Sequence, residues 1–191
     1  LYHLTRKGWS DVVLLERTEL TAGSTWHAAG LLPLFNMSYT VGQLHKYSVD
    51  LYKRLPAETG QDVSFHVTGN LRLATCRDRM DEYRKYCGTA NTIGVPFQLI
   101  SPAEVKELWP LVNLGGDADT PAVIGALYHP DDGHIAPADL TMALRRAARS
   151  AGAEINEQTE VTGAVQMPSG EWKLTTNRGE ITAEHVVLCT G

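Results

Sequence analysis

The chain has 191 residues, enough for one large domain or for the larger part of a two-domain chain. Hydrophobic residues make up 43% and charged residues 20%, a composition typical of a folded globular protein and too apolar for a disordered one. The 17 Lys and Arg against 22 Asp and Glu leave a formal net charge of -5, which disfavours a nucleic-acid partner, and the longest apolar stretch, residues 28–35, is too short to cross a membrane.

The first elements predict the second half of a dinucleotide-binding βαβ unit. Residues 1–7 have the pattern of a helix end, Gly8 suits the position after it, and residues 11–16 suit a parallel strand buried on both faces. In such a unit the acid at the end of the strand binds the ribose of the nucleotide, the role that Glu16 would take, unless it is an ordinary strand-end acid. The glycine motif of the unit would lie about 20 residues earlier, before residue 1, so we expect the chain to be truncated there.

Helices and strands of both kinds follow. The predicted helices cover residues 40–59, 78–92, 101–109 and 137–151. The predicted strands are a pair within 63–74 that turns at Gly69 and Asn70, a strand at 123–129, a hairpin of 161–167 with 172–176, and a buried strand at 184–188. The buried strands near both ends suit one parallel sheet, and the antiparallel pattern between them indicates an insertion.

These elements predict an α/β fold with a Rossmann-like nucleotide-binding domain, an inserted α+β layer on the substrate side, and truncation at both ends. Residues 1–35 would belong to the nucleotide-binding domain, without its first strand and glycine motif. Residues 36–130 would form the inserted layer, and residues 131–191 would return to the nucleotide-binding domain and leave it incomplete.

The segment from Thr21 to Leu31 is the densest candidate for a binding site. Small residues let a backbone approach a pyrophosphate or an aromatic ring system, and the hydroxyls of Ser24 and Thr25 can donate to phosphate. His27 lies in this segment beside Trp26, in a tight loop that would leave it little room to move. A ligand-bonding histidine and an ordinary turn histidine bonded to the backbone both fit this pattern.

Other polar groups carry weaker signals. Residues 129–134 hold two histidines and two aspartates, but their spacing matches no common ligand pattern, so we predict a structural turn and no metal site. Arg145, Arg146 and Arg149 fit a solvated helix face. The three cysteines form no C-x-x-C pair, which indicates a reducing compartment, and no G-x-S-x-G element supports a hydrolase.

Four strings resemble one known family. They are ELTAGSTWHAAGL at residues 19–31, HKYS at 45–48, GNLR at 69–72 and YHPDDGHI at 128–135. Together they resemble dimethylglycine dehydrogenase and sarcosine dehydrogenase, which are FAD-dependent amine dehydrogenases of the D-amino-acid-oxidase-like group. The resemblance runs over essentially the whole chain, and STWHAAGL is its most specific string.

The resemblance implies a set of cofactor-binding residues. Glu16 would bind the adenosine ribose with Arg17 beside it, and the backbone of Val161 would contact the adenine side. Thr190 and Gly191 would form the turn that closes over FAD. The flavin would be lined by Gly23, Ser24, Thr25, Trp26, His27, Ala28, Ala29, Gly30 and Leu31, with the His27 imidazole joined covalently to the 8α-carbon of the ring.

The resemblance also implies a reaction and partners. A small N-methylated glycine, dimethylglycine or sarcosine, would be oxidatively demethylated, and electron-transfer flavoprotein or oxygen would accept the electrons. The main catalytic residues, and a region that could bind tetrahydrofolate, would lie beyond residue 191. The whole protein would be located in a bacterial cytoplasm or a mitochondrial matrix. The alternatives are an oxygen-using N-methylglycine oxidase and a non-catalytic relative of the pyruvate dehydrogenase phosphatase regulatory subunit type.

Overall fold

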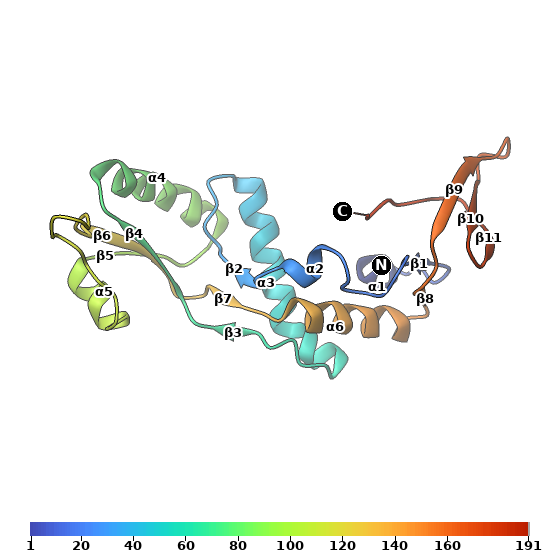
Figure 1. Cartoon of the computed structure of the whole chain (residues 1–191), viewed down its shortest axis with the longest axis horizontal. Helices are drawn as coiled ribbons and strands as arrows, with labels where there is room; N and C mark the ends of the chain where they lie inside the picture. Colours follow the sequence, from blue (N-terminus) through green and yellow to red (C-terminus); the bar gives the residue numbers. More distant parts are fainter. Residues whose placement is uncertain (191) are drawn as a thin grey trace. The chain divides into compact units, whose positions relative to one another are not determined.

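The computed structural model describes residues 1–190, which fold as two compact units (Figure 1). Unit 1 contains Leu1–Ala29, Leu55–Val63 and the residues from Ala136 onward, and unit 2 contains Gly30–Arg54 and Ser64–Ile135. Among the described residues, no helix combines the length and the apolar character that a membrane span requires. The assignment of cofactor and substrate roles to residues 1–35, 36–130 and 131–191 stays a prediction.

Two helices of unit 1 form where local signals predict them. Helix α1 (Tyr2–Arg6) ends before Gly8, which has a φ of +91°. Helix α6 (Pro137–Ser150) begins with a proline in its first turn and ends before Gly152, with a φ of +93°. These two helices contact each other, and the Tyr2 hydroxyl donates to the Glu58 carboxylate at 2.7 Å.

The strand predicted at 11–16 exists but is shorter and more exposed than expected. Strand β1 (Val13–Leu15) pairs in parallel with β8 (Glu154–Asn156), with Leu14 opposite Ile155. The expectation of burial on both faces is wrong, because Val13 is 38% exposed and β8 is the only neighbour of β1 in its sheet among residues 1–190. The parallel pairing itself is present.

The last part of unit 1 contains an antiparallel sheet, and it lacks the strand predicted at residues 184–188. Strands β9 (Val161–Gln166), β10 (Trp172–Thr176) and β11 (Gly179–Ala183) form a three-stranded meander, drawn in orange to red in Figure 1. The predicted hairpin is therefore confirmed, with β11 as an addition. The strand predicted at 184–188 does not form: Val187 and Leu188 are 74% and 83% exposed, and no described strand pairs with them. A strand needs a neighbour for its backbone hydrogen bonds, whatever its apolar content.

The helices of unit 2 also follow their local signals. Helix α3 (Tyr39–Thr59) continues past Pro56, and its last residues belong to unit 1. Helix α4 (Arg77–Ile93) ends at Gly94, which has a φ of +79°. Helix α5 (Pro102–Leu108) has the predicted capping box, since the Ser101 hydroxyl accepts the Glu104 N–H at 3.3 Å and the Glu104 carboxylate accepts the Ser101 N–H at 2.7 Å.

Two antiparallel sheets complete unit 2. One has the order β4-β6-β5, from β4 (Asn70–Ala74), β6 (Gly125–His129) and β5 (Gln98–Ile100). The other has the order β2-β7-β3, from β2 (Leu31–Leu32), β7 (Gly133–His134) and β3 (His66–Val67). The predicted strand pair at 63–74 is wrong, because β3 and β4 enter different sheets. Gly69 has a φ of +70° and donates its N–H to the Asp132 carbonyl at 2.8 Å.

The core of unit 2 lies between these sheets and their helices. Tyr86 of α4 is fully buried and packs in a cluster with Ala74, Tyr83, Ala90 and Leu127. A second cluster joins α5 to the sheet through Ile100, Val105, Val112 and Ala126. Burial of these side chains supplies most of the stabilisation of the unit.

The Ser101 cap gives a first testable prediction. Ser101→Ala removes the side-chain acceptor at the start of α5 and is expected to destabilise the protein by about 1 kcal/mol. Thermal denaturation of the full-length polypeptide measures the effect. Ser10→Ala is the control, since Ser10 is exposed and caps no helix. An equal midpoint for Ser101→Ala and wild type would contradict the prediction.

Candidate cofactor site

Glu16 lies directly after β1, at the carboxyl end of the parallel pair. Its N–H donates to the Asn156 carbonyl at 2.9 Å, and its own carbonyl accepts the Thr159 N–H at 2.8 Å. Its carboxylate accepts the Thr18 N–H at 2.8 Å and the Thr18 hydroxyl at 3.1 Å. The structure therefore brings Glu16 close to the chain segment that leads into Val161.

A partly exposed ion pair anchors the loop after β1. Glu157, the residue after β8, accepts the Leu20 N–H at 2.9 Å and pairs with Arg145 of α6 at 3.1 Å. Arg146 and Arg149 are exposed, as predicted for a solvated helix face, whereas Arg145 is only partly exposed because it pairs with this acid. Sequence reasoning missed Glu157, although an acid directly after a parallel strand, like Glu16, was the signal that could have found it.

The segment from Thr21 to Leu31 is open on its surface. Its centre is the one-turn helix α2 (Ser24–His27), which contacts α6. Trp26 is 76% exposed and Leu31 is 69% exposed. His27 and the alanines after it are exposed as well, so the expectation of a tight loop around His27 is wrong. A tight loop would need packing neighbours that a single helical turn does not supply.

The other predicted cofactor-binding residues have different surroundings. Val161 is the first residue of β9, two residues after the Thr159 amide that bonds Glu16. Arg17 follows Glu16 and is exposed. Thr190 is exposed in a segment without regular structure, and Gly191 lies outside the described residues.

The residues present fit a flavin cofactor. A planar apolar ring system needs a surface of small residues and apolar groups that it can cover, and Gly23, Ala28 and Ala29 are exposed beside Trp26. The His27 ring is also exposed, so a group bound over this segment can reach it. Glu16, at the carboxyl end of β1, would be the residue that holds the sugar end of the cofactor.

The second cluster, at 129–134, forms the predicted turn within unit 2. His129 and Asp132 are 0% and 1% exposed. The His129 ring Nδ1 lies 3.1 Å from the Pro96 carbonyl, and Asp132 Oδ1 accepts the Leu34 N–H at 2.9 Å. No group of three potential metal ligands occurs in the part of the chain that the structure describes.

Burial shifts both of these titratable groups. Loss of hydration lowers the pKa of His129 to about 4 and raises the pKa of Asp132 to about 6. Arg72 also disfavours the charged form of His129, whereas it favours the carboxylate of Asp132. The neighbouring Tyr86 has its pKa raised to about 12, first by burial and then by the Asp132 charge.

Comparison with known proteins decides the family. Residues 1–191 match the sequence profile described as "DAO: FAD dependent oxidoreductase". The chain belongs to this family of FAD-dependent oxidoreductases. This oxidoreductase is 42% identical over 190 residues to "Dimethylglycine dehydrogenase, mitochondrial" of Rattus norvegicus, a match that covers 100% of the chain and 22% of the relative.

The chain is also similar to two further curated proteins and to a solved structure. The oxidoreductase is 37% identical to "Sarcosine dehydrogenase, mitochondrial" of Homo sapiens over 200 residues, and 35% identical to "Pyruvate dehydrogenase phosphatase regulatory subunit, mitochondrial" of Mus musculus over 190 residues. Each match covers 100% of the chain and 21% of the relative. The L-proline dehydrogenase from P.horikoshii superposes with a TM-score of 0.88 at 30% identity.

The coverage defines what is shared. The chain spans about a fifth of the length of these curated relatives, and it covers 48% of the L-proline dehydrogenase chain. The α/β fold of FAD-dependent oxidoreductases is therefore present over about half of their length. The predicted resemblance to dimethylglycine and sarcosine dehydrogenases is confirmed.

Proposed function

We propose that the polypeptide containing this chain is an FAD-dependent amine dehydrogenase that demethylates an N-methylated glycine. The observation that carries the proposal is the 42% identity to dimethylglycine dehydrogenase over the whole chain. When bound, FAD supplies the chemistry by taking a hydride equivalent from the carbon next to the amine nitrogen. Water hydrolyses the resulting iminium to formaldehyde and the demethylated amine, or the one-carbon unit passes to tetrahydrofolate, and electron-transfer flavoprotein or oxygen receives the electrons.

In this proposal the residues of the chain bind and orient the cofactor. Glu16 holds the adenosine ribose by hydrogen bonds to its hydroxyls, with Arg17 beside it, and the Val161 backbone faces the adenine side. Gly23 through Leu31 would line the flavin, and Thr190 and Gly191 would close over it. The exposed His27 imidazole is joined covalently to the flavin 8α-carbon, which prevents dissociation and withdraws electron density from the ring.

The covalent bond is tested with His27→Ala. We expect the full-length wild-type polypeptide to keep its yellow, fluorescent flavin after acid precipitation. The His27→Ala variant is expected to release all of its flavin to the supernatant, because no other bond would hold the cofactor once the fold is lost. His3→Ala, at another exposed histidine of unit 1, is the control and should keep its flavin.

Two results would contradict the covalent role. One is release of the flavin from the unfolded wild type, and the other is retention of flavin by unfolded His27→Ala. The measurement is absorbance at the flavin bands of the washed precipitate after it is redissolved, with the supernatant as the complementary sample.

A non-catalytic regulatory role is the second candidate. The observation in its favour is the 35% identity to the pyruvate dehydrogenase phosphatase regulatory subunit, also over the whole chain. Anaerobic mixing with dimethylglycine, sarcosine or glycine betaine separates the two functions. Bleaching of the flavin by one of these amines supports the dehydrogenase, and a flavin that none of them reduces supports the regulatory protein. Either protein would be located in a mitochondrial matrix or in the cytoplasm of a bacterium, and the relatives whose names say mitochondrial support the first of these.

A further inference from the structure

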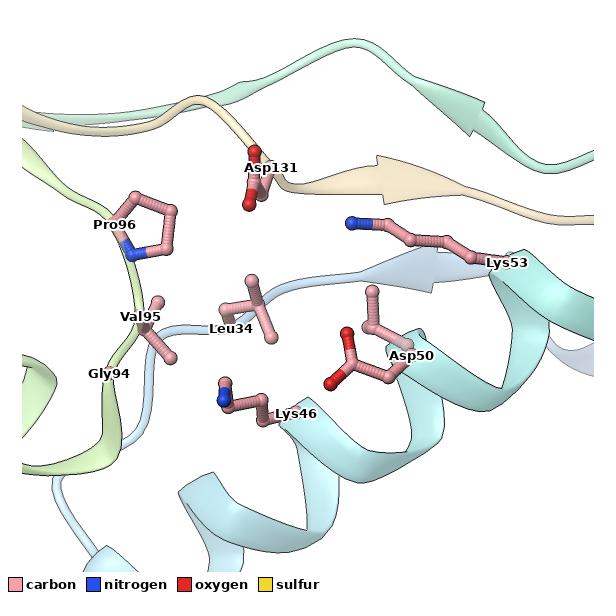
Figure 2. A pocket seen from close by; sticks show the side chains of 9 residues that line it. Leu34, Lys46, Asp50, Lys53, Gly94, Val95, Pro96 and Asp131 are labelled. Carbon is pink, nitrogen blue, oxygen red and sulfur yellow. The ribbon is translucent and has the colours of Figure 1, made fainter.

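A small cavity lies in unit 2, between α3 and the two chain segments opposite it (Figure 2). Its volume is about 50 Å³. Leu34, Val49 and Val95 form an apolar floor, and these three side chains are almost fully buried in one cluster. Such a volume holds about four waters or a molecule of a few heavy atoms, and is far too small for a nucleotide.

Four charged side chains surround this floor. Lys46, Asp50 and Lys53 follow one another along one face of α3, and Asp131 comes from the turn at 129–134. In Figure 2, Lys53 extends toward Asp131, and the Asp50 carboxylate lies on the same side of the helix as Lys46. Within residues 1–190, no ion pair joins any two of these four groups.

Buried side chains hold the two walls of the cavity in place. Asp132 Oδ1 accepts the N–H of Leu34 at 2.9 Å, and this bond fixes the wall that supplies Leu34. The ring of His129 bonds the carbonyl of Pro96 at 3.1 Å and fixes the opposite wall. Because His129 and Asp132 are themselves almost fully buried, the backbone of these two walls is fixed without a ligand, whereas the side chains of Asp50 and Lys53 are exposed.

We infer that this cavity binds a small amino-acid zwitterion. Lys53 and Asp131 lie at the same end of the cavity and match a ligand that carries one charge of each sign, with its carboxylate toward Lys53 and its ammonium toward Asp131. A simple anion would bring its charge close to the two aspartates. The apolar floor receives the carbon atoms of the ligand. The inference does not depend on the proposed function, because it involves only residues of unit 2.

The test measures binding of glycine to the full-length holoprotein by equilibrium dialysis. Wild type is expected to bind glycine at least tenfold more tightly than acetate or methylammonium, each of which carries only one of the two charges. Lys53→Met and Asp131→Asn are each expected to weaken glycine binding at least tenfold. Lys85→Met, at an exposed lysine on α4, is the control and should bind glycine as wild type does.

Two results would overturn the inference. One is glycine binding that is equal in wild type, Lys53→Met and Asp131→Asn, which would place the ligand elsewhere. The other is acetate binding as tight as glycine binding, which would indicate a site for anions only. If Lys53→Met does not fold, the near-isosteric Asp131→Asn decides the question together with Lys53→Gln. The measurement needs no turnover, so its outcome is separate from that of the flavin experiments.

Discussion

Replacement of Gly133 by alanine is expected to lower the free energy of unfolding of unit 2 by roughly 3 kcal/mol. A Cβ at this position would lie 2.1 Å from the His66 carbonyl oxygen and 3.0 Å from its carbonyl carbon. Both atoms belong to the backbone of β3, which cannot move aside without losing its pairing with β7. Because β7 is the central strand of its sheet, the displacement would also disturb its pairing with β2.

The effect is measured by hydrogen exchange in increasing urea, followed in peptides that cover residues 64–74 and 125–135. Gly88→Ala is the matched control, because Gly88 lies on the exposed side of α4 and a Cβ there meets no atom within 4 Å. We expect this control to stabilise the unit by about 0.5–1 kcal/mol through a better helix propensity. Wild-type protection in Gly133→Ala would show that β3 and β7 are not packed as described.

The buried pair His129 and Asp132 predicts two opposite dependences of stability on pH. The folded pKa of His129, about 4, lies below the value of 6.5 for an unfolded chain, so stability falls as the pH decreases from 6.5 to 4. The folded pKa of Asp132, about 6, lies above the unfolded value of 3.8, so stability rises as the pH decreases from 6 to 4. Each contribution amounts to about 3 kcal/mol over its window. In wild type they largely cancel.

Single variants should reveal each half of the pair. In Asp132→Asn only the histidine remains, and the unit should lose about 3 kcal/mol of stability between pH 6.5 and pH 4. In His129→Gln only the aspartate remains, and the unit should gain a similar amount between pH 6 and pH 4. Arg72 and Tyr86 are present in both variants. The difference in pH dependence between a variant and wild type therefore reports the residue that was replaced.

Urea titrations followed by hydrogen exchange at pH 4, 5 and 6 measure these slopes in unit 2. Peptides that cover residues 161–183 of unit 1 serve as the internal control, because the substituted residues His129 and Asp132 lie in unit 2. Parallel curves for Asp132→Asn and wild type would contradict the raised pKa of Asp132, and an Asp132→Asn curve that stays flat on acidification would contradict the lowered pKa of His129.

Elements with local signals could be predicted from the sequence. The capping box at Ser101, the glycines after α1 and α6, and the turn between β9 and β10 all act over a few residues, so their information lies in the neighbouring sequence. The pairing of β3 and β4 could not be predicted in this way. Each pairs with a strand about 60 residues away, and only the tertiary fold selects that partner.

In the candidate site, too, features set by the neighbouring sequence could be predicted, and features set by the tertiary fold could not. Glu16 follows a strand, and the structure places it at the end of a parallel pair as predicted. The exposure of His27 depends on which segments cover α2, a property that its own sequence does not encode. Glu157 was missed because its role comes from Arg145 and Leu20, and the Leu20 amide lies 137 residues away along the chain.

The turn at Asp132 also constrains the order in which the protein can form during translation. Its carbonyl accepts the N–H groups of Thr68 and Gly69, its carboxylate accepts that of Leu34, and the neighbouring His129 bonds Pro96. All of these partners leave the ribosome before Asp132 does. The contacts that join these four segments of unit 2 therefore form only after the turn at residues 129–134 has emerged from the ribosome.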